Sequence, residues 1–283
     1  MGRQDNVEIF EDTQRLYKSN ERLISAIEHS SAEQGSFTGT GRYWYGPGYR
    51  IYQQPAKVVV SPKRTLEAAA PYAYAGKKVC VLNFASATNP GGGVIKGSSA
   101  QEEAICRCST LYPNLKDQRM WYQFYAPHRR AHDPLHNDDC IYTPGVVVFK
   151  SDTDYPQRMP EEKWYSVNVL TCAAPNLRER PSTEMNSGDG DAAMHISRKK
   201  LQALHEKRMR RMLEIAWAKE NEVVILGAFG CGAFRNPPAV VAQAMKTVVQ
   251  EYRKKFETIE FAVYCSTQYD TNYRVFQQVL GGM

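Results

Sequence analysis

Six short apolar runs, distributed along most of the chain, place the strongest limit on what it can fold into. They lie at 57–60, 78–86, 145–149, 164–173, 222–229 and 260–265. Several are apolar at almost every position, which is typical of strands covered on both faces. Patterns with helical spacing lie between them, at about 101–112, 198–219 and 237–256. The alternation predicts an α/β protein with a mostly parallel or mixed sheet between layers of helices.

The first fifth of the chain has a different pattern. Residues 6–34 indicate a polar helix with Leu16, Leu23 and Ile27 as its buried stripe, and a Gly- and Tyr-rich stretch over 35–52 interrupts it. A length of 283 residues accommodates one α/β domain with an extension. We therefore expect an N-terminal helical extension over residues 1–50, packed on a main domain over residues 51–283.

Composition narrows the class of protein. No apolar run approaches the length of a membrane span, and the N-terminus lacks the apolar core of a signal peptide, so we expect a cytoplasmic protein with no membrane partner. The seven cysteines fall mostly in apolar runs, which predicts buried free thiols. No cluster has metal-ligand spacing, so neither a metal nor a cofactor is expected. We expect a monomer.

The net charge of +6 is concentrated in the stretch 198–211. Such a run could attract a polyanion, and a nucleic-acid-binding module is one alternative for the chain. The same stretch carries Leu204, Met212 and Ile215 at helical spacing. The basic side chains are therefore interpreted as the solvated side of a helix, and no specific nucleic-acid partner is expected.

Two glycine clusters follow strand candidates and precede helix starts. The first is Asn89-Pro90-Gly91-Gly92-Gly93, followed by Gln101-Glu102-Glu103; the second is Gly230-Cys231-Gly232, followed by a helix with Asn236 as its expected N-cap. Glycine exposes backbone N–H groups that a side chain would cover, and a helix N-terminus favours an anion. In such sheets ligands bind at the carboxyl ends of strands. The two clusters predict a phosphate-bearing ligand held from both sides.

The consecutive carboxylates have two interpretations. Ser99 and Glu102 fit a capping box, in which Glu102 only stabilises its own helix. That explanation does not extend to Glu103, which lies about 100° further round the helix. Most glycosidases place two carboxyl groups on opposite sides of the bond, whereas neighbours on one helical turn approach from the same side. On a glycosidic bond one would hold sugar hydroxyls and the other would transfer the proton.

The second glycine cluster also has alternatives. It could be only a tight strand-to-helix turn that requires positive φ. Cys231 could be a nucleophile, because a helix N-terminus lowers a thiol pKa. No histidine is obviously placed to act with it, so backbone contact with phosphate is the favoured interpretation.

Taken together, these motifs resemble a known family. Asn83-Phe84-Ala85-Ser86, the triple glycine, Gln101-Glu102-Glu103 and Gly230-Cys231-Gly232-Ala233-Phe234 resemble the signature of microbial-type poly(ADP-ribose) glycohydrolases, and the segments 141–149 and 174–176 add to the likeness. The resemblance implies a three-layer α/β/α macrodomain-like mixed sheet with an N-terminal helical extension. It also implies hydrolysis of ribose–ribose O-glycosidic bonds in poly(ADP-ribose), with ADP-ribose, the polymer or an ADP-ribosylated protein as partner.

The resemblance assigns a role to each motif. Glu103 would be the general acid/base, Glu102 would hold hydroxyls of the reacting sugar, and Gln101 would support the pair. The backbone of Gly91, Gly92, Gly93 and Val94 would wrap the distal ribose and diphosphate, and Gly230, Cys231, Gly232 and Ala233 would cover the diphosphate from the other side. Phe234 would lie near the distal ribose, and Ser86 or Asn89 would contact it. An aromatic ring should stack on adenine.

Two other activities fit the same pocket. One is removal of single ADP-ribose units from proteins, and the other is a non-catalytic ADP-ribose-binding macrodomain. The second is disfavoured, because a binding module gains little from two carboxylates beside an anionic ligand.

Overall fold

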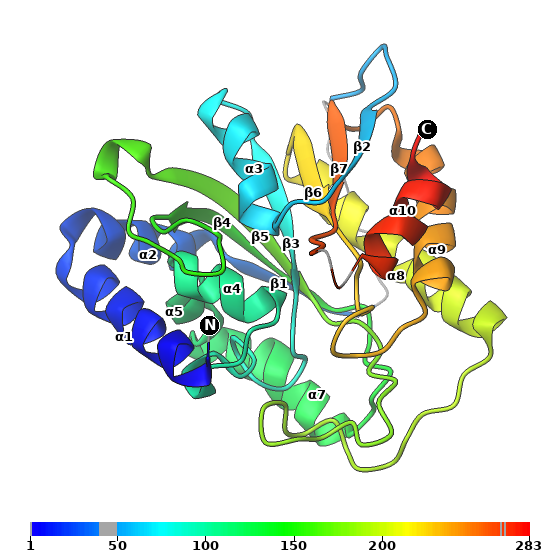
Figure 1. Ribbon diagram of the computed structural model, residues 1–283, viewed down its shortest axis with the longest axis horizontal. Coiled ribbons are helices and arrows are strands. Elements are labelled where there is room, and N and C mark those ends of the chain that lie inside the picture. The colour runs from blue at the N-terminus through cyan, green and yellow to red at the C-terminus, as the bar shows by residue number, and fades with distance from the viewer. Residues whose placement is uncertain (1, 40–49, 267, 269) are drawn as a thin grey trace.

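A single mixed sheet runs through the protein. The computed structural model describes residues 2–39, 50–266, 268 and 270–283, and within them the strand order is β1-β4-β5-β3-β6-β7-β2 (Figure 1). The strands are β1 Gly35–Phe37, β2 Lys57–Ser61, β3 Val79–Phe84, β4 Cys140–Val148, β5 Tyr165–Cys172, β6 Val223–Leu226 and β7 Thr258–Ala262. β4 is antiparallel to β1 and β5, and the other neighbouring strands are parallel. The carboxyl ends of β2, β3, β5, β6 and β7 therefore share one edge.

Helices cover both faces of the sheet. The α-helices are α1 Arg3–Ser19, α2 Glu21–Glu33, α3 Thr65–Tyr74, α4 Gln101–Cys108, α5 Leu111–Leu115, α6 Gln118–Met120, α7 Ala126–Ala131, α8 Arg198–Ala218, α9 Pro238–Tyr252 and α10 Thr271–Leu280. Short 3-10 turns lie at η1 Val94–Lys96 and η3 Glu161–Lys163, and a π-helical turn lies at η2 Trp121–Tyr125.

Alternate residues of the strands supply two cores. In β3, Cys80 and Leu82 join the core with residues of α8, α9 and α10, whereas Val79 and Val81 join the core with residues of α1, α3, α4 and α5. Successive side chains of a strand point to opposite faces, so an almost continuously apolar strand is required when both faces are covered. The predicted three-layer α/β/α macrodomain-like fold is confirmed.

Several element boundaries differ from the prediction. The helix expected over 6–34 is two helices separated at Asn20, whose side chain accepts a hydrogen bond from the Leu23 N–H. The buried positions of the first are Asn6, Phe10, Thr13 and Tyr17, while Leu16 and Ile27 are only partly buried. The helix expected over 101–112 ends at Cys108, and Pro113 lies in the first turn of α5, where proline is tolerated.

The N-terminal segment is part of the folded body. β1 pairs with β4 in the common sheet, and Phe10 of α1 is fully buried in one core. The Asn6 side-chain amide donates to the Gly97 carbonyl, and the Thr13 hydroxyl donates to the Arg107 carbonyl. These contacts fix α1 along α4 and the turn before it. The interrupting Gly- and Tyr-rich stretch lies partly outside the described residues, at 40–49.

The interpretation of the basic helix as solvated is wrong at two positions, Arg208 and Arg211, which are buried. Arg208 of α8 is fully buried, and its guanidinium donates to the carbonyls of Ala173, Leu135 and His136 and pairs with Asp138. It therefore ties the end of β5 to the loop before β4. Searched over the described ranges, the helices include none that is long and apolar enough to cross a membrane.

Candidate active site

A cavity of about 580 Å³ opens at the edge where the parallel strands end. Its walls come from the turns after β2, β3, β6 and β7, from the long connection after β5, and from the first turn of α4. Ligands of open α/β sheets bind at this edge. Nine predicted site residues line the cavity, namely Ser86, Gly92, Gln101, Glu102, Glu103, Gly230, Gly232, Ala233 and Phe234.

Gln101 fixes the start of α4 against the sheet. Its side-chain carbonyl accepts from the Phe84 N–H at 2.8 Å, and its amide donates to the Leu82 carbonyl at 2.7 Å and to the Thr65 hydroxyl at 3.0 Å. One side chain thus satisfies backbone groups where β3 ends. The first turn of α4, with both glutamates, is held at the cavity wall.

Glu102 does not cap its helix. The N-cap position is Ala100 and has no side-chain cap, while the Glu102 carboxylate accepts from the Ser86 N–H at 2.8 Å and from the Asn83 amide at 3.2 Å. The capping-box interpretation is therefore wrong. Glu102 is only 3 % exposed, and burial, followed by the neighbouring charge of Glu103, raises its pKa well above the usual value.

Glu103 has one anchored and one unanchored oxygen. Its Oε1 accepts from the Gly93 N–H at 2.9 Å. Its Oε2 is buried and has no hydrogen-bond partner among the described residues. Buried polar atoms are almost always paired in folded proteins, so an unpaired carboxylate oxygen at a cavity wall indicates a group that acts on a ligand.

The backbone at Gly92 lies directly against the carboxylates of Glu102 and Glu103. It has φ +57°, and a Cβ at this position would lie 2.5 Å from Glu103 Oε1 and 3.1 Å from Glu102 Oε2. Any other residue would displace the pair. Gly91, Gly93 and Val94 lie behind this wall; Val94 is fully buried, and the Gly93 N–H is used by Glu103. Their contact with a ligand stays a prediction.

Ser86 and Asn89 are in contact, but of the two Ser86 lines the cavity and Asn89 does not. Ser86 lines the cavity, but its hydroxyl donates to Asn186 Oδ1 at 2.5 Å and accepts from the Asn89 N–H at 3.0 Å. The Asn89 side-chain amide donates to the Ser187 carbonyl at 2.8 Å. Of the two candidates for ribose contact, Ser86 is the one at the cavity. Its hydroxyl is engaged within the protein.

The second glycine loop contains one glycine that the fold requires, Gly230, and one with open space beside it, Gly232. Gly230 has φ +75°, and a Cβ there would lie 2.5 Å from the Ala174 Cβ, whereas a Cβ on Gly232 would meet nothing within 4 Å. Cys231 does not line the cavity, and burial raises the pKa of its thiol, which opposes a nucleophilic thiolate. Asn236 is not the N-cap of α9: it is buried, and its amide donates to the carbonyls of Pro175 and Gly230.

Sequence patterns did not identify several residues at the cavity. Asn186 lines it from the connection after β5. Tyr264 lines it after β7, is 46 % exposed, and has the Arg64 guanidinium 3.9 Å from its ring centroid. Polar residues in a connection without periodicity leave no local signal. Asn83, which the family resemblance includes without a role, supports Glu102 from within β3.

The fold and site together define a macrodomain-like glycosidase. A model of the microbial-type poly(ADP-ribose) glycohydrolase (PARG) catalytic domain matches residues 4–151, and the chain belongs to that family. Its structure is similar to that of PARG from Thermomonospora curvata bound to the inhibitor ADP-HPD, with 26 % identity over 97 % of this chain and 99 % of that one and a TM-score of 0.78. PARG from Deinococcus radiodurans in complex with ADP-ribose is 28 % identical over 91 % and 98 % of the two chains, with a TM-score of 0.74. A search of curated protein sequences found no match.

Proposed function

We propose that this protein hydrolyses ribose–ribose O-glycosidic bonds of poly(ADP-ribose) and releases ADP-ribose. The observation that carries the proposal is the unpaired, buried Oε2 of Glu103 beside Glu102 at the wall of a ligand-sized cavity. Family membership and the ADP-ribose and inhibitor complexes of the two similar structures support it.

The two glutamates divide the work. Glu103 delivers a proton to the departing ribose oxygen and then takes one from the attacking water, because its Oε2 has no competing partner in the described residues. Glu102, fixed by Ser86 and Asn83, holds hydroxyls of the reacting ribose. Burial and the neighbouring Glu103 raise the pKa of Glu102, which favours the protonated form of Glu102 and limits the negative charge that it places beside the ligand.

Cations and open backbone would hold the diphosphate. Lys63, Arg64 and Arg178 line the cavity and complement a ligand with two negative charges. The open side of Gly232 lets the 230–233 backbone approach the phosphates. Phe234 lies beside Arg178, whose guanidinium is 5.3 Å from its ring centroid. We assign this loop to the diphosphate and Phe234 to the distal ribose.

Tyr264 is the aromatic residue best placed for adenine. It follows β7, which is separated from β3 by β6 alone, so its end of the cavity lies about 10 Å from the end of β3 beside the carboxylates. A diphosphate and two riboses bridge such a distance. One face of the ring is covered by Arg64, and we assign adenine to the other face.

We propose further that residues 1–50 form an extension to a catalytic domain of residues 51–283, and that the protein acts in the cytoplasm as a monomer. The five buried free thiols support a reducing compartment.

The test is incubation with labelled poly(ADP-ribose) followed by separation of products. Free ADP-ribose is the expected product. A mono-ADP-ribosylated protein, incubated in parallel, separates polymer hydrolysis from removal of single units. If ADP-ribose binds but neither substrate is cleaved, the chain is an ADP-ribose-binding module and the proposal is wrong.

A further inference from the structure

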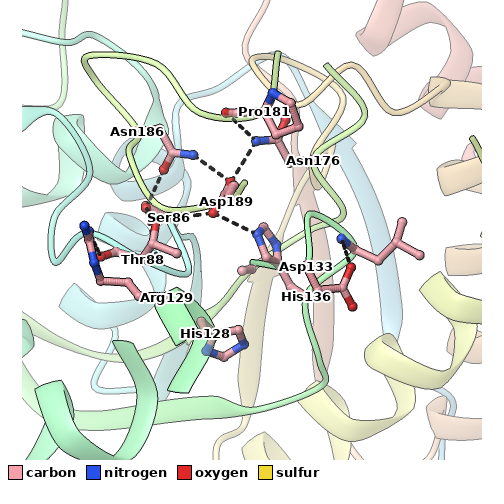
Figure 2. Close-up of polar contacts among 12 residues, drawn as sticks. Ser86, Thr88, His128, Arg129, Asp133, His136, Asn176, Pro181, Asn186 and Asp189 are labelled. Atoms are coloured by element: carbon pink, nitrogen blue, oxygen red, sulfur yellow. Dashed lines mark hydrogen bonds and ion pairs between the residues drawn. The ribbon is translucent and has the colours of Figure 1, made fainter. Parts of the chain in front are cut away.

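The wall of the cavity beside the carboxylates comes from a long connection without helix or strand. This connection, residues 173–197, joins β5 to α8, and its Thr183, Met185 and Asn186 line the cavity. A structureless segment of this length keeps one conformation only when specific contacts hold it. Here the contacts converge on Asp189, as Figure 2 shows.

Asp189 is a buried carboxylate surrounded by donors from three segments. Its side chain is fully buried. Oδ2 accepts from the amides of Asn176 at 2.8 Å and Asn186 at 2.7 Å, while Oδ1 lies 3.2 Å from both Thr88 Oγ1 and His136 Nε2. Burial opposes the charge, but the contact with His136 and the two amides outweigh it and lower the pKa of Asp189. The group is therefore a stable buried anion.

His136 connects this anion to the end of β5. Its Nδ1 lies 2.8 Å from the Ala174 carbonyl, while its Nε2 faces Asp189, so both ring nitrogens face acceptors. Its backbone has φ +57°, a conformation that non-glycine residues rarely adopt. Arg208 holds it there by donating to the His136 carbonyl. A residue kept in an unfavourable conformation by several buried contacts indicates a position whose exact placement matters.

A short series of contacts links Asp189 to the catalytic pair. Asp189 accepts from the Asn186 amide, Asn186 Oδ1 accepts from the Ser86 hydroxyl, and the Ser86 N–H donates to Glu102. Arg129 provides a second clamp between the same segments, since it donates to the carbonyls of Thr88 and Ser187. The orientation of the Asn186 amide is thus set from both of its ends.

We propose that Asp189 is a positioning residue for the reaction: it holds Asn186 and the adjoining wall against Ser86, so that the pocket for the distal ribose beside Glu102 is formed before the ligand binds. The inference rests on the proposed function. Asp189 acts mainly on the ribose end, because most groups assigned to adenine and diphosphate lie on the turns after β2, β6 and β7. Arg178, which lies on the same connection and donates to Asn176, is the exception among them. Loss of Asp189 should therefore weaken ADP-ribose binding much more than ADP binding.

Calorimetric titration of Asp189→Asn with ADP-ribose and with ADP tests this selectivity. We expect ADP-ribose affinity to fall at least tenfold and ADP affinity to fall at most threefold, since Arg178 of this connection is one of several groups assigned to the diphosphate. Asp133→Asn is the matched control: the same substitution on the neighbouring loop, at an exposed residue whose carboxylate accepts from the Leu135 N–H. It should change neither affinity. Equal losses for both ligands in Asp189→Asn, or no loss for either, would overturn the proposal.

A double-mutant cycle tests whether Asp189 acts through Asn186. Asn186→Ala alone should lower polymer turnover and ADP-ribose affinity. Adding Asp189→Asn should then cost less than a further twofold, because the group that Asp189 positions is already absent. A merely structural role predicts multiplied losses, and that result would refute positioning. If Asp189→Asn does not fold, Thr88→Val removes one donor to Asp189 while preserving shape; unchanged ADP-ribose selectivity in this variant would also overturn the proposal.

Hydrogen exchange separates this inference from the proposed function. In Asp189→Asn, amides over residues 182–190 should exchange at least tenfold faster, while those of α4 and the Asp133→Asn control should match wild type. This holds whether or not the wild-type protein cleaves the polymer. Inactive wild-type protein with this exchange pattern would refute only the proposed activity. Unchanged exchange would refute the positioning role.

Discussion

Replacing Glu103 by glutamine isolates proton transfer from ligand binding. The glutamine carbonyl can keep the hydrogen bond from the Gly93 N–H that now anchors Oε1, and its amide group then occupies the place of Oε2. Shape and anchoring are preserved, but the group that gives and takes the proton is lost. General acid–base groups contribute about 10²–10⁴ in rate, or roughly 2.7–5.5 kcal/mol of barrier, so polymer turnover should fall by that factor.

The assay needs binding and turnover on the same samples. ADP-ribose affinity of Glu103→Gln, measured by calorimetry, should stay within about threefold of wild type, a change of less than 0.7 kcal/mol. Glu103→Asp is the control for geometry: it keeps the acid but withdraws it by one methylene from Gly93, and should also lose most turnover. If Glu103→Gln kept more than a tenth of wild-type activity, Glu103 would not be the catalytic residue.

Further substitutions test the rest of the site. Burial and Glu103 raise the folded-state pKa of Glu102 above its unfolded value near 4.5, so the stability that this group contributes is fully present below pH 4.5 and is lost as pH rises through the folded-state pKa. Glu102→Gln should therefore raise Tm relative to wild type more at pH 8 than at pH 4. An equal shift in Tm at both pH values would contradict this. Gly232→Val should leave Tm unchanged but weaken ADP-ribose binding at least tenfold, about 1.4 kcal/mol. Gly230→Ala should lower stability by at least about 1–2 kcal/mol in thermal melts, because the φ of +75° at Gly230 and the nearby Ala174 both oppose a Cβ there. Cys231→Ser should keep activity, and its loss with binding intact would restore a thiol mechanism. Polymer hydrolysis should survive EDTA, because carboxylates supply the proton transfer; loss that a divalent cation restores would require another mechanism.

The sequence was most informative where burial forces a pattern. The strands with two covered faces, such as β3 and β6, need apolar residues at nearly every position, so their existence could be predicted. The short β1 has three residues, and α3 contains Pro71, so neither follows its own local preference. The positions of β1 and α3 are set by tertiary packing, which no local sequence pattern indicates. Gly230 and Gly232 show the same limit, because the sequence does not distinguish the glycine that needs a positive φ from the one that has open space around it.

The site divides in the same way. The glutamates and glycines were predictable, because their chemistry depends on residue type at fixed spacing along one turn. Asn186, which lines the cavity, and Asp189, which is buried behind it, were not predictable. Both lie in a connection whose conformation depends on contacts with Thr88, Asn176 and His136. Such residues are ordinary polar loop residues in the sequence. Their role is visible only in the folded chain.

The two walls of the cavity are held in different ways, and this difference separates catalysis from ligand selectivity. The part from β3 through Gln101 to Glu103 is fixed by hydrogen bonds between side chains and backbone groups, so substitution of Gln101 would disturb the end of the sheet. The opposite wall is a long segment held through side-chain contacts around Asp189. Chemistry is therefore set by the sheet and the first turn of α4. If Asp189 positions the ribose pocket as proposed, the connection after β5 sets the preference for ligands that carry the distal ribose, and substitutions there should change that preference while Glu102 and Glu103 are retained.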